Sequence, residues 1–128
     1  MIYLNTSVAL AHLLAEDRVP ADAMWTATLV SSRLLEYELW NRLHAPGSAV
    51  THGDAARELL QRLAFLERAL PVHTRALEPF PVVVRTVDAL HLASIEFLRA
   101  QRQDVALASY DTRMLEAARK LRIPIAEI

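Results

Sequence analysis

Short apolar segments that resemble strands alternate with helical segments along almost the whole chain, and this alternation restricts the fold more than any other feature. Strands that are separated by helices usually pair in parallel, and the helices cover both faces of the sheet. The sequence therefore predicts an α/β fold with a parallel sheet in its middle layer.

The expected elements are spread evenly over the chain, without a repeat, a linker or a low-complexity segment. Strands are expected at residues 2–4, 28–31, about 66–72, 105–109 and 123–125. Helices are expected at 7–14, near Pro20, at 33–44, from a capping-box pattern at 51–54 to about 65, from 86 to about 102, and at 112–121. A chain of 128 residues suits one domain, so we expect a single domain over residues 1–128.

The composition is that of a folded chain and excludes several kinds of site. Hydrophobic residues make up 53% and charged residues 23% of the sequence, which does not fit a disordered chain. The absence of cysteine excludes disulfides and thiolate metal sites. Two glycines leave little room for a glycine-rich phosphate loop.

Charge and hydropathy limit the partners and the location that we expect. A net charge of −1 argues against a broadly cationic nucleic-acid binder. A local phosphate-binding groove stays open, because 14 residues are basic and only Lys120 is not arginine. No apolar stretch approaches the roughly 18 residues of a membrane span, and the N-terminus lacks signal-peptide features. We therefore expect no membrane association and a cytoplasmic protein.

Four polar residues fall where an α/β sheet usually binds its ligand, or within apolar helical stretches. Asn5 and Asp111 come just after expected strands, and ligands of open α/β sheets bind at the carboxyl ends of strands. Glu38 and Asp88 lie in the apolar stretches LLEYELW and VDALHLA. Each also has a structural interpretation: a turn or cap for Asn5, a helix N-cap for Asp111, a first-turn acid for Asp88 and a solvated face for Glu38.

As a set, these residues point to a metal site. Carboxylates that converge on one pocket repel each other unless a cation lies between them. Oxygen ligands without histidine or cysteine suit Mg²⁺ or Mn²⁺, and such ions support phosphodiester hydrolysis. This inference depends on the four positions meeting in the folded chain.

The order and spacing of four motifs carry a family resemblance. The segments are MIYLNTSVAL, SSRLLEYEL, RTVDALHLA and ASYDTRMLEAA. Together they resemble the PIN-domain ribonucleases, and specifically the VapC-type toxins of bacterial toxin–antitoxin pairs. The spacing from Ser32 and the following LWNRL select Glu38 rather than Glu36 as the acid of the second motif.

The resemblance implies a fold, a reaction and partners. The implied fold is a three-layer α/β/α sandwich with a parallel sheet of about five strands. The implied protein is a homodimeric endoribonuclease that uses Mg²⁺ or Mn²⁺, cleaves tRNA or rRNA in the cytoplasm to inhibit translation, and is blocked by a VapB-type antitoxin. The motifs assign the catalytic and metal-binding positions to Asn5, Glu38, Asp88 and Asp111, with supporting roles for Thr6, Ser7, Ser109, Arg85 and Arg113.

Asn5 departs from the family pattern, which has aspartate at this position as a direct metal ligand. An amide can offer a cation one carbonyl oxygen but no charge. Changes around metal sites commonly cost about 10–100-fold in affinity or activity, or roughly 1.4–2.8 kcal/mol. We therefore expect a correctly folded chain with weak metal binding and little or no nuclease activity.

Two explanations of Asn5 and two main classes of function stay open. Asn5 is either an engineered inactivation, which the three retained acids favour, or a natural loss of catalysis. The chain is either an attenuated nuclease toxin or a non-catalytic PIN module that binds RNA or a protein. Another Mg²⁺-dependent phosphohydrolase is a weaker alternative. His91, three residues after Asp88, is interpreted as a buried structural histidine rather than a catalytic one.

Overall fold

The structure is a computed structural model that describes residues 1–45, 47, 49–67 and 69–128. Its described strands form one parallel sheet of four, in the order β3-β2-β1-β4. The strands are β1 (Ile2–Leu4), β2 (Leu29–Ser32), β3 (Leu63–Leu66) and β4 (Ala106–Ala108). The chain adds β2 and β3 on one side of β1 and β4 on the other, so the strand order reverses next to β1.

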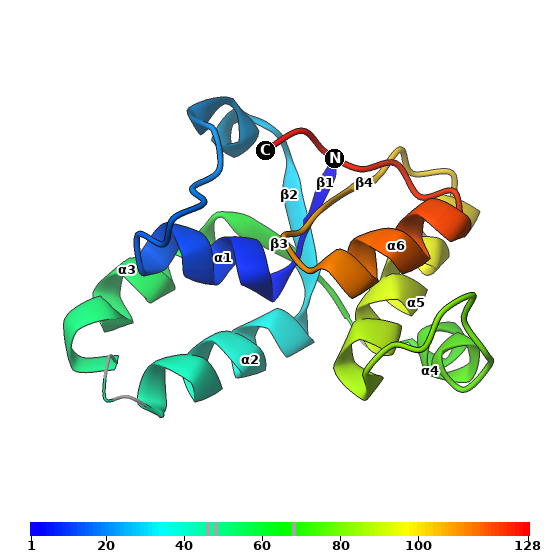
Figure 1. Ribbon diagram of the computed structural model, residues 1–128, viewed down its shortest axis with the longest axis horizontal. Helices are drawn as coiled ribbons and strands as arrows, with labels where there is room; N and C mark the ends of the chain where they lie inside the picture. The colour runs from blue at the N-terminus through cyan, green and yellow to red at the C-terminus, as the bar shows by residue number, and fades with distance from the viewer. Residues whose placement is uncertain (46, 48, 68) are drawn as a thin grey trace.

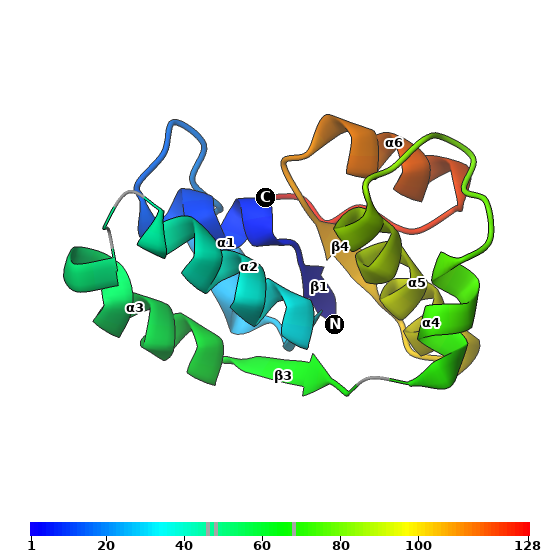
Figure 2. The same cartoon turned by 90° about the horizontal axis from the view of Figure 1, so that it is seen from below.

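Helices cover both faces of this sheet, as Figures 1 and 2 show. One group lies on one side of the sheet and contains α1 (Thr6–Leu13), α2 (Arg33–His44) and α3 (Ala49–Gln61). The other contains α4 (Leu70–Ala76), α5 (Thr86–Ala100) and α6 (Thr112–Lys120). A short 3₁₀ helix, η1 (Asp22–Thr26), precedes β2. The expected three-layer α/β/α architecture is confirmed.

Side chains that alternate along the strands build a separate apolar core on each face of the sheet. Leu4 and Leu29 belong to the cluster that packs under α1, α2 and α3. Their neighbours Tyr3 and Val30 belong to the cluster under α5 and α6. A strand imposes this period of two, and it explains why strands that are buried on both faces are mostly apolar, with Ser31 and Ser32 of β2 as exceptions.

The expected strand at residues 123–125 is the first of three corrections to the predicted elements. Ile125 forms a single isolated bridge with Leu107 instead of a fifth strand. The Leu107 amide donates to the Pro124 carbonyl, and the Ala126 amide donates to the Leu107 carbonyl. Since Pro124 has no amide hydrogen to donate, the pairing stops at this one bridge.

The expected strand at about 66–72 is also wrong. In the structure β3 ends at Leu66, and α4 begins at Leu70 with Pro71 in its first turn, where proline is tolerated. Arg68, inside the expected strand, lies outside the described residues. The paired strand is instead Leu63–Leu66, which aligns with all four residues of β2.

The third correction concerns the long middle helix. The expected cap at residues 51–54 lies inside α3, which begins at Ala49 and ends at Gln61 rather than near residue 65. Gly53 lies against α2, where an added Cβ would be 3.8 Å from the Trp40 ring. That distance is an ordinary contact, so Gly53 is an interior residue of α3 and not part of a helix start. Within the described residues, no helix is long and apolar enough to cross a membrane.

Candidate functional site

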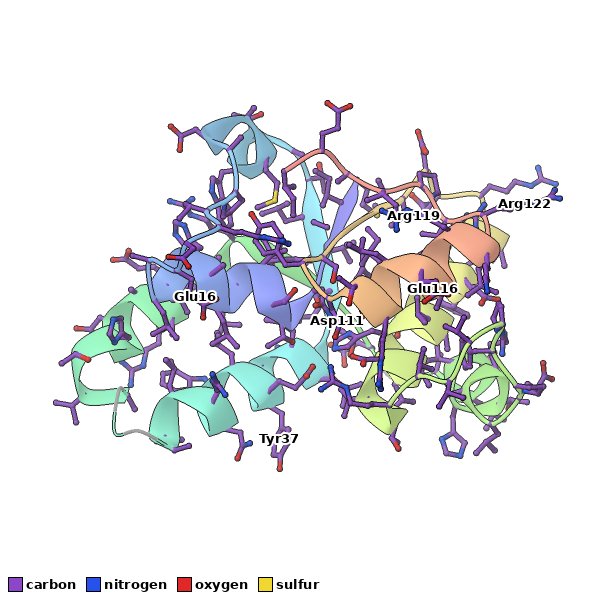
Figure 3. All side chains as sticks on the ribbon, in the orientation of Figure 1. Glu16, Tyr37, Asp111, Glu116, Arg119 and Arg122 are labelled. Atoms are coloured by element: carbon purple, nitrogen blue, oxygen red, sulfur yellow. The ribbon has the colours of Figure 1, made fainter. Side chains whose placement is uncertain are left out.

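The polar residues gather where β1 and β4 end, which is the point at which the strand order reverses. Asn5 directly follows β1 and caps α1, and Ser109 and Asp111 follow β4. Neighbouring parallel strands that connect in opposite directions leave a crevice at their carboxyl ends, and ligands of such sheets bind there. Figure 3 shows Asp111 near the middle of the molecule, between the two groups of helices.

Asn5 is buried, and its side-chain oxygen is fully used by neighbouring donors. Oδ1 accepts from the Ser7 amide at 3.2 Å, from Ser7 Oγ at 2.7 Å and from Ser109 Oγ at 3.2 Å. The backbone donor fixes the amide orientation, because the flipped form would set Nδ2 against the Ser7 N–H. Nδ2 instead lies 3.1 Å from the Met114 sulfur, which is a weak acceptor.

The two serines join the first turn of α1 to the segment that follows β4. Ser7 Oγ accepts from the Tyr110 amide at 2.9 Å, and Ser109 Oγ accepts from the Asp111 amide at 3.0 Å. Both hydroxyls donate to Asn5 Oδ1, so one acceptor holds the start of α1 and the segment after β4 together. This connection fixes where α6 begins relative to β1.

Asp88 and Asp111 share one cationic side chain. Arg85 Nε lies 3.0 Å from Asp88 Oδ2, and Arg85 Nη2 lies 2.7 Å from Asp111 Oδ2. The Arg85 side chain is 70% exposed, whereas those of Asp88 and Asp111 are 9% and 21% exposed. An exposed cation thus spans two carboxylates that belong to different helices.

Each carboxylate has its own environment. Burial raises the pKa of Asp88 above its ordinary value, against the opposing effect of the Arg85 hydrogen bond and charge. Asp111 is the N-cap of α6, and its Oδ1 accepts from the amides of Arg113 and Met114. The cap interpretation of Asp111 is therefore correct, and it leaves the second oxygen to face Arg85.

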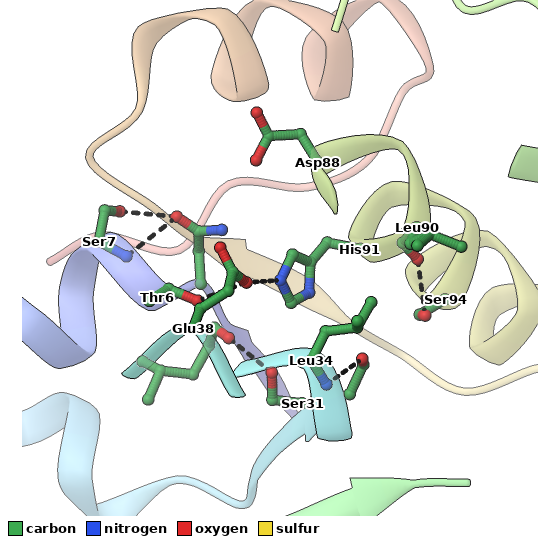
Figure 4. Close-up of polar contacts among 12 residues, drawn as sticks. Thr6, Ser7, Ser31, Leu34, Glu38, Asp88, Leu90, His91 and Ser94 are labelled. Atoms are coloured by element: carbon green, nitrogen blue, oxygen red, sulfur yellow. Dashed lines mark hydrogen bonds and ion pairs between the residues drawn. The ribbon is translucent and has the colours of Figure 1, made fainter. Parts of the chain in front are cut away.

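Glu38 enters the site from α2 and is held through one oxygen. Oε1 accepts from Thr6 Oγ1 at 2.9 Å and lies 2.6 Å from His91 Nε2, as Figure 4 shows. Within the described part of the chain, Oε2 has no hydrogen-bond partner. Glu36 lies on another side of α2 and pairs with Arg33 at the surface. Glu38, and not Glu36, therefore reaches the side of the molecule that holds Thr6 and His91.

Two residues that sequence analysis did not place at the site lie directly behind Glu38. His91 is buried, as expected for a structural histidine, and its Nδ1 lies 2.7 Å from the hydroxyl of the buried Tyr3. His91 follows Asp88 by one helical turn, and this spacing was the available signal. Nothing in the sequence distinguishes Tyr3 from an ordinary core residue of β1.

Arg113 differs from Arg85 although both lie beside an acid of the site. Its side chain is exposed and forms no hydrogen bond or ion pair with any residue that the structure describes. Of these two arginines, Arg85 is the one that pairs with carboxylates among the described residues. Arg113 projects from the first turn of α6, next to Asp111.

The arrangement suits a divalent cation in its donor chemistry and partly in its geometry. Across residues 1–45, 47, 49–67 and 69–128, no three His, Cys, Asp or Glu side chains are close enough to hold a metal. The Arg85 guanidinium nevertheless acts as a stand-in cation, because it reaches Asp88 and Asp111 together. Both acceptors are carboxylate oxygens, which Mg²⁺ and Mn²⁺ prefer.

Comparison with known proteins identifies relatives of this chain. The PIN domain family matches residues 2–120. Ribonuclease VapC35 of Mycobacterium tuberculosis (strain CDC 1551 / Oshkosh) is 31% identical over 131 residues, covering 98% of this chain and 95% of the relative. Ribonuclease VapC47 of the same strain is 28% identical over 131 residues, covering 94% and 92%.

The same degree of similarity is found in a second strain. Ribonuclease VapC35 of strain ATCC 25618 / H37Rv is 31% identical over 131 residues, with the same coverage. No solved structure shows a significant match. The family match spans almost the whole chain, and the relatives align with it nearly end to end. The chain therefore belongs to the PIN-domain family and, within it, to the VapC-type ribonucleases.

Proposed function

We propose that this chain is an attenuated form of a Mg²⁺- or Mn²⁺-dependent endoribonuclease toxin. The observation that carries the proposal is the Arg85 guanidinium, which spans Asp88 and Asp111 in a member of the VapC-type ribonucleases. Two carboxylates that share an organic cation at this sheet edge are suited to share a metal ion. Glu38, whose Oε2 lacks a partner within the described residues, would supply a further oxygen.

The residues around these acids have distinct proposed roles. When bound, such an ion supplies positive charge that polarises a phosphodiester and activates water. Arg85, once released from the carboxylates, and Arg113 bind the RNA phosphates, because guanidinium groups pair well with phosphate oxygens. Thr6 orients Glu38, and Ser7 and Ser109 fix the start of α1 and the segment after β4.

Asn5 is the proposed reason for attenuation. It occupies one of the four positions assigned to the metal, together with Glu38, Asp88 and Asp111. An aspartate there would accept the same donors through Oδ1 and keep a second, charged oxygen, where Asn5 has the Nδ2 group. The amide therefore removes one negative charge and directs N–H hydrogens into the space that this oxygen would occupy.

The substrate and partners that we propose follow the relatives. The relatives are named ribonucleases of the VapC series, and we extend that activity to this chain with tRNA or rRNA as substrate. We further propose a cognate VapB-type antitoxin, a homodimer in which each chain is one domain over residues 1–128, and action in the cytoplasm. These parts of the proposal rest on the family alone.

Paired RNA cleavage assays test this function. The chain as it stands and its Asn5→Asp variant are incubated with total tRNA and with rRNA, in Mg²⁺, in Mn²⁺ or in EDTA. We expect the aspartate variant to cut RNA only when metal is present, at least 10–100-fold faster than the Asn5 chain. The Asn5→Ser variant is a matched control, since its small hydroxyl restores no carboxylate.

Two outcomes would contradict the proposal. If the Asn5 chain cleaves RNA at millimolar Mg²⁺ as fast as the Asn5→Asp variant, position 5 does not limit activity. If neither chain cuts any RNA, the nuclease proposal fails and a non-catalytic PIN module that binds RNA or protein becomes the better account.

A further inference from the structure

A continuous hydrogen-bonded chain runs from the buried core to Glu38. The Ser32 amide donates to the Tyr3 hydroxyl at 3.2 Å, and this hydroxyl lies 2.7 Å from His91 Nδ1. On the other side of the ring, His91 Nε2 lies 2.6 Å from Glu38 Oε1. Ser32 is also the N-cap of α2, the helix that carries Glu38. The hydrogen-bond network therefore begins at the cap of α2 and ends at Glu38 on the same helix.

The protons in this chain can be assigned from the donors and acceptors present. A carboxylate only accepts, so His91 Nε2 carries the hydrogen that faces Glu38. In a neutral imidazole the other nitrogen is then an acceptor, and the Tyr3 hydroxyl donates to it. The Tyr3 phenol carries its proton at neutral pH, so it has a hydrogen to donate. With this assignment, Tyr3 donates to His91 and His91 donates to Glu38.

The geometry at Glu38 separates its two oxygens. Thr6 Oγ1 and His91 Nε2 both donate to Oε1. Oε2 has no partner in the described part of the chain. The side chain is 26% exposed, whereas the His91 ring behind it is fully buried. The two donors therefore hold the Glu38 carboxylate in one orientation. Among the described residues, Oε2 stays without a hydrogen-bond partner.

We infer that Tyr3 and His91 are positioning residues, which fix the Glu38 carboxylate so that Oε2 faces the cation held by Asp88 and Asp111. This inference rests on the function proposed above. It assigns a role to a histidine that the packing alone would explain as core. The chemical reason is general: hydrogen bonds behind a metal ligand fix its orientation, and their loss commonly costs about 10–100-fold in metal affinity or activity.

Substitutions at His91 in the Asn5→Asp background test the inference. His91→Leu fills the space but donates nothing to Glu38, whereas His91→Gln can return an amide donor near the Nε2 position. Leu98→Ala, on the same helix and buried in the apolar cluster around α5, is the control for a packing defect. Mn²⁺ binding is measured by titration calorimetry, and kcat and KM are measured on the cleaved RNA.

We expect His91→Leu to weaken Mn²⁺ binding about 10–100-fold and to lower kcat while KM for RNA changes little. His91→Gln should recover much of both, and Leu98→Ala should lower the melting temperature without weakening Mn²⁺ binding. If His91→Leu binds Mn²⁺ as tightly as the Asn5→Asp chain does, the inference is overturned. An equal loss in Leu98→Ala overturns it too, because the effect would then be one of packing.

Two further measurements keep the inference testable if His91→Leu does not fold. Tyr3→Phe keeps the ring and removes only the donor to Nδ1, and we expect weaker Mn²⁺ binding there too; an unchanged affinity contradicts the inference. Long-range ¹H–¹⁵N spectra of the Asn5 chain, without metal, should show His91 protonated at Nε2 and not at Nδ1. The opposite tautomer overturns it.

The Asn5→Asp chain, in which the His91 variants are made, distinguishes failure of this inference from failure of the proposed function. If the Asn5→Asp chain binds no Mn²⁺ and cuts no RNA, the proposed function fails and the inference falls with it. If that chain binds and cuts while the His91 variants match it, only the positioning role is wrong.

Discussion

At the scale of single residues, the site is defined by how each negative charge is balanced. The Arg85 guanidinium bridges Asp88 and Asp111, and the charge at position 5 is absent because the residue is an amide. Arg85 therefore compensates part of the negative charge of Asp88 and Asp111. If the proposed cation binds Asp88 Oδ2 and Asp111 Oδ2, it competes with Arg85 for these two oxygens.

Arg85→Ala should change metal binding and RNA binding in opposite directions. Removal of the competing cation should raise Mn²⁺ affinity severalfold, while the loss of a phosphate contact should weaken RNA binding and reduce its salt dependence. Calorimetric titration with Mn²⁺ and RNA binding at several salt concentrations measure the two effects. The expected cost to fold stability is small, roughly 0–1 kcal/mol, since Arg85 is largely exposed.

Arg113→Ala is the matched control, because Arg113 lies beside Asp111 without pairing to any described carboxylate. It should weaken RNA binding and leave Mn²⁺ affinity unchanged. Weaker Mn²⁺ binding by Arg85→Ala would mean that Arg85 supports the metal site instead of competing with it.

The buried Asp88 should make the stability of the metal-free chain depend on pH. Its pKa is raised in the folded state from an ordinary value of 3.8, so the folded state binds more protons than the unfolded state between those two pKa values. Stability should therefore fall as pH rises through this window. Asp88→Asn should be at least as stable as the parent at pH 7, and this advantage should disappear below about pH 3.8.

Urea unfolding in EDTA at a series of pH values measures this effect. The same variant should lose Mn²⁺ binding in the Asn5→Asp background, which separates the structural role of the carboxylate from its proposed functional role. A variant that is clearly less stable at pH 7 would show that the Arg85 pair outweighs the cost of burial.

At the scale of elements, most helices and strands could be predicted because their local patterns agree with their packing. The helix at 33–44 matches α2 at both ends, and strand 2–4 matches β1. The errors arise where tertiary contacts override local signals. The pattern at 51–54 looks like a helix start, but α3 already begins at Ala49. The apolar residues near Leu66 belong to two elements, because Leu63–Leu66 pairs with β2 and α4 follows.

Motif spacing proposes the residues of the candidate site, and their roles stay predictions; the contacts between them could not be predicted. Motif spacing selects Glu38, and the structure directs it toward Thr6 and His91 while Glu36 pairs with Arg33. Spacing cannot reveal that Arg85 joins acids from two helices, because that contact depends on how α5 and α6 pack. The Tyr3 hydroxyl behind His91 also depends on packing across the sheet.

Asp111 combines a helix cap with a proposed metal ligand, and two substitutions separate these roles. Asp111→Asn keeps an oxygen that can cap α6, so stability should change little. Asp111→Ala removes the cap and should cost about 0.5–2 kcal/mol of unfolding free energy. In the Asn5→Asp background both should lose Mn²⁺ binding. Urea unfolding and metal titration measure the two effects, and full Mn²⁺ affinity in Asp111→Asn would remove Asp111 from the proposed ligands.

At the scale of the whole molecule, the site lies on the boundary between two apolar cores. One core packs α1, α2 and α3 against the sheet, and the other packs α5 and α6 against its opposite face. Asn5 and Glu38 come from the first group of helices, and Asp88 and Asp111 from the second. A cation bound by these residues would connect the two layers and stabilise the folded state by mass action.

The most direct test of this account is the Mn²⁺ affinity of the Asn5 chain compared with that of Asn5→Asp, measured by titration calorimetry without RNA. We predict that aspartate at position 5 tightens binding at least 10–100-fold, since it adds a charged oxygen at one of the four positions assigned to the metal. Equal affinities of the two chains would contradict the claim that position 5 controls the metal site.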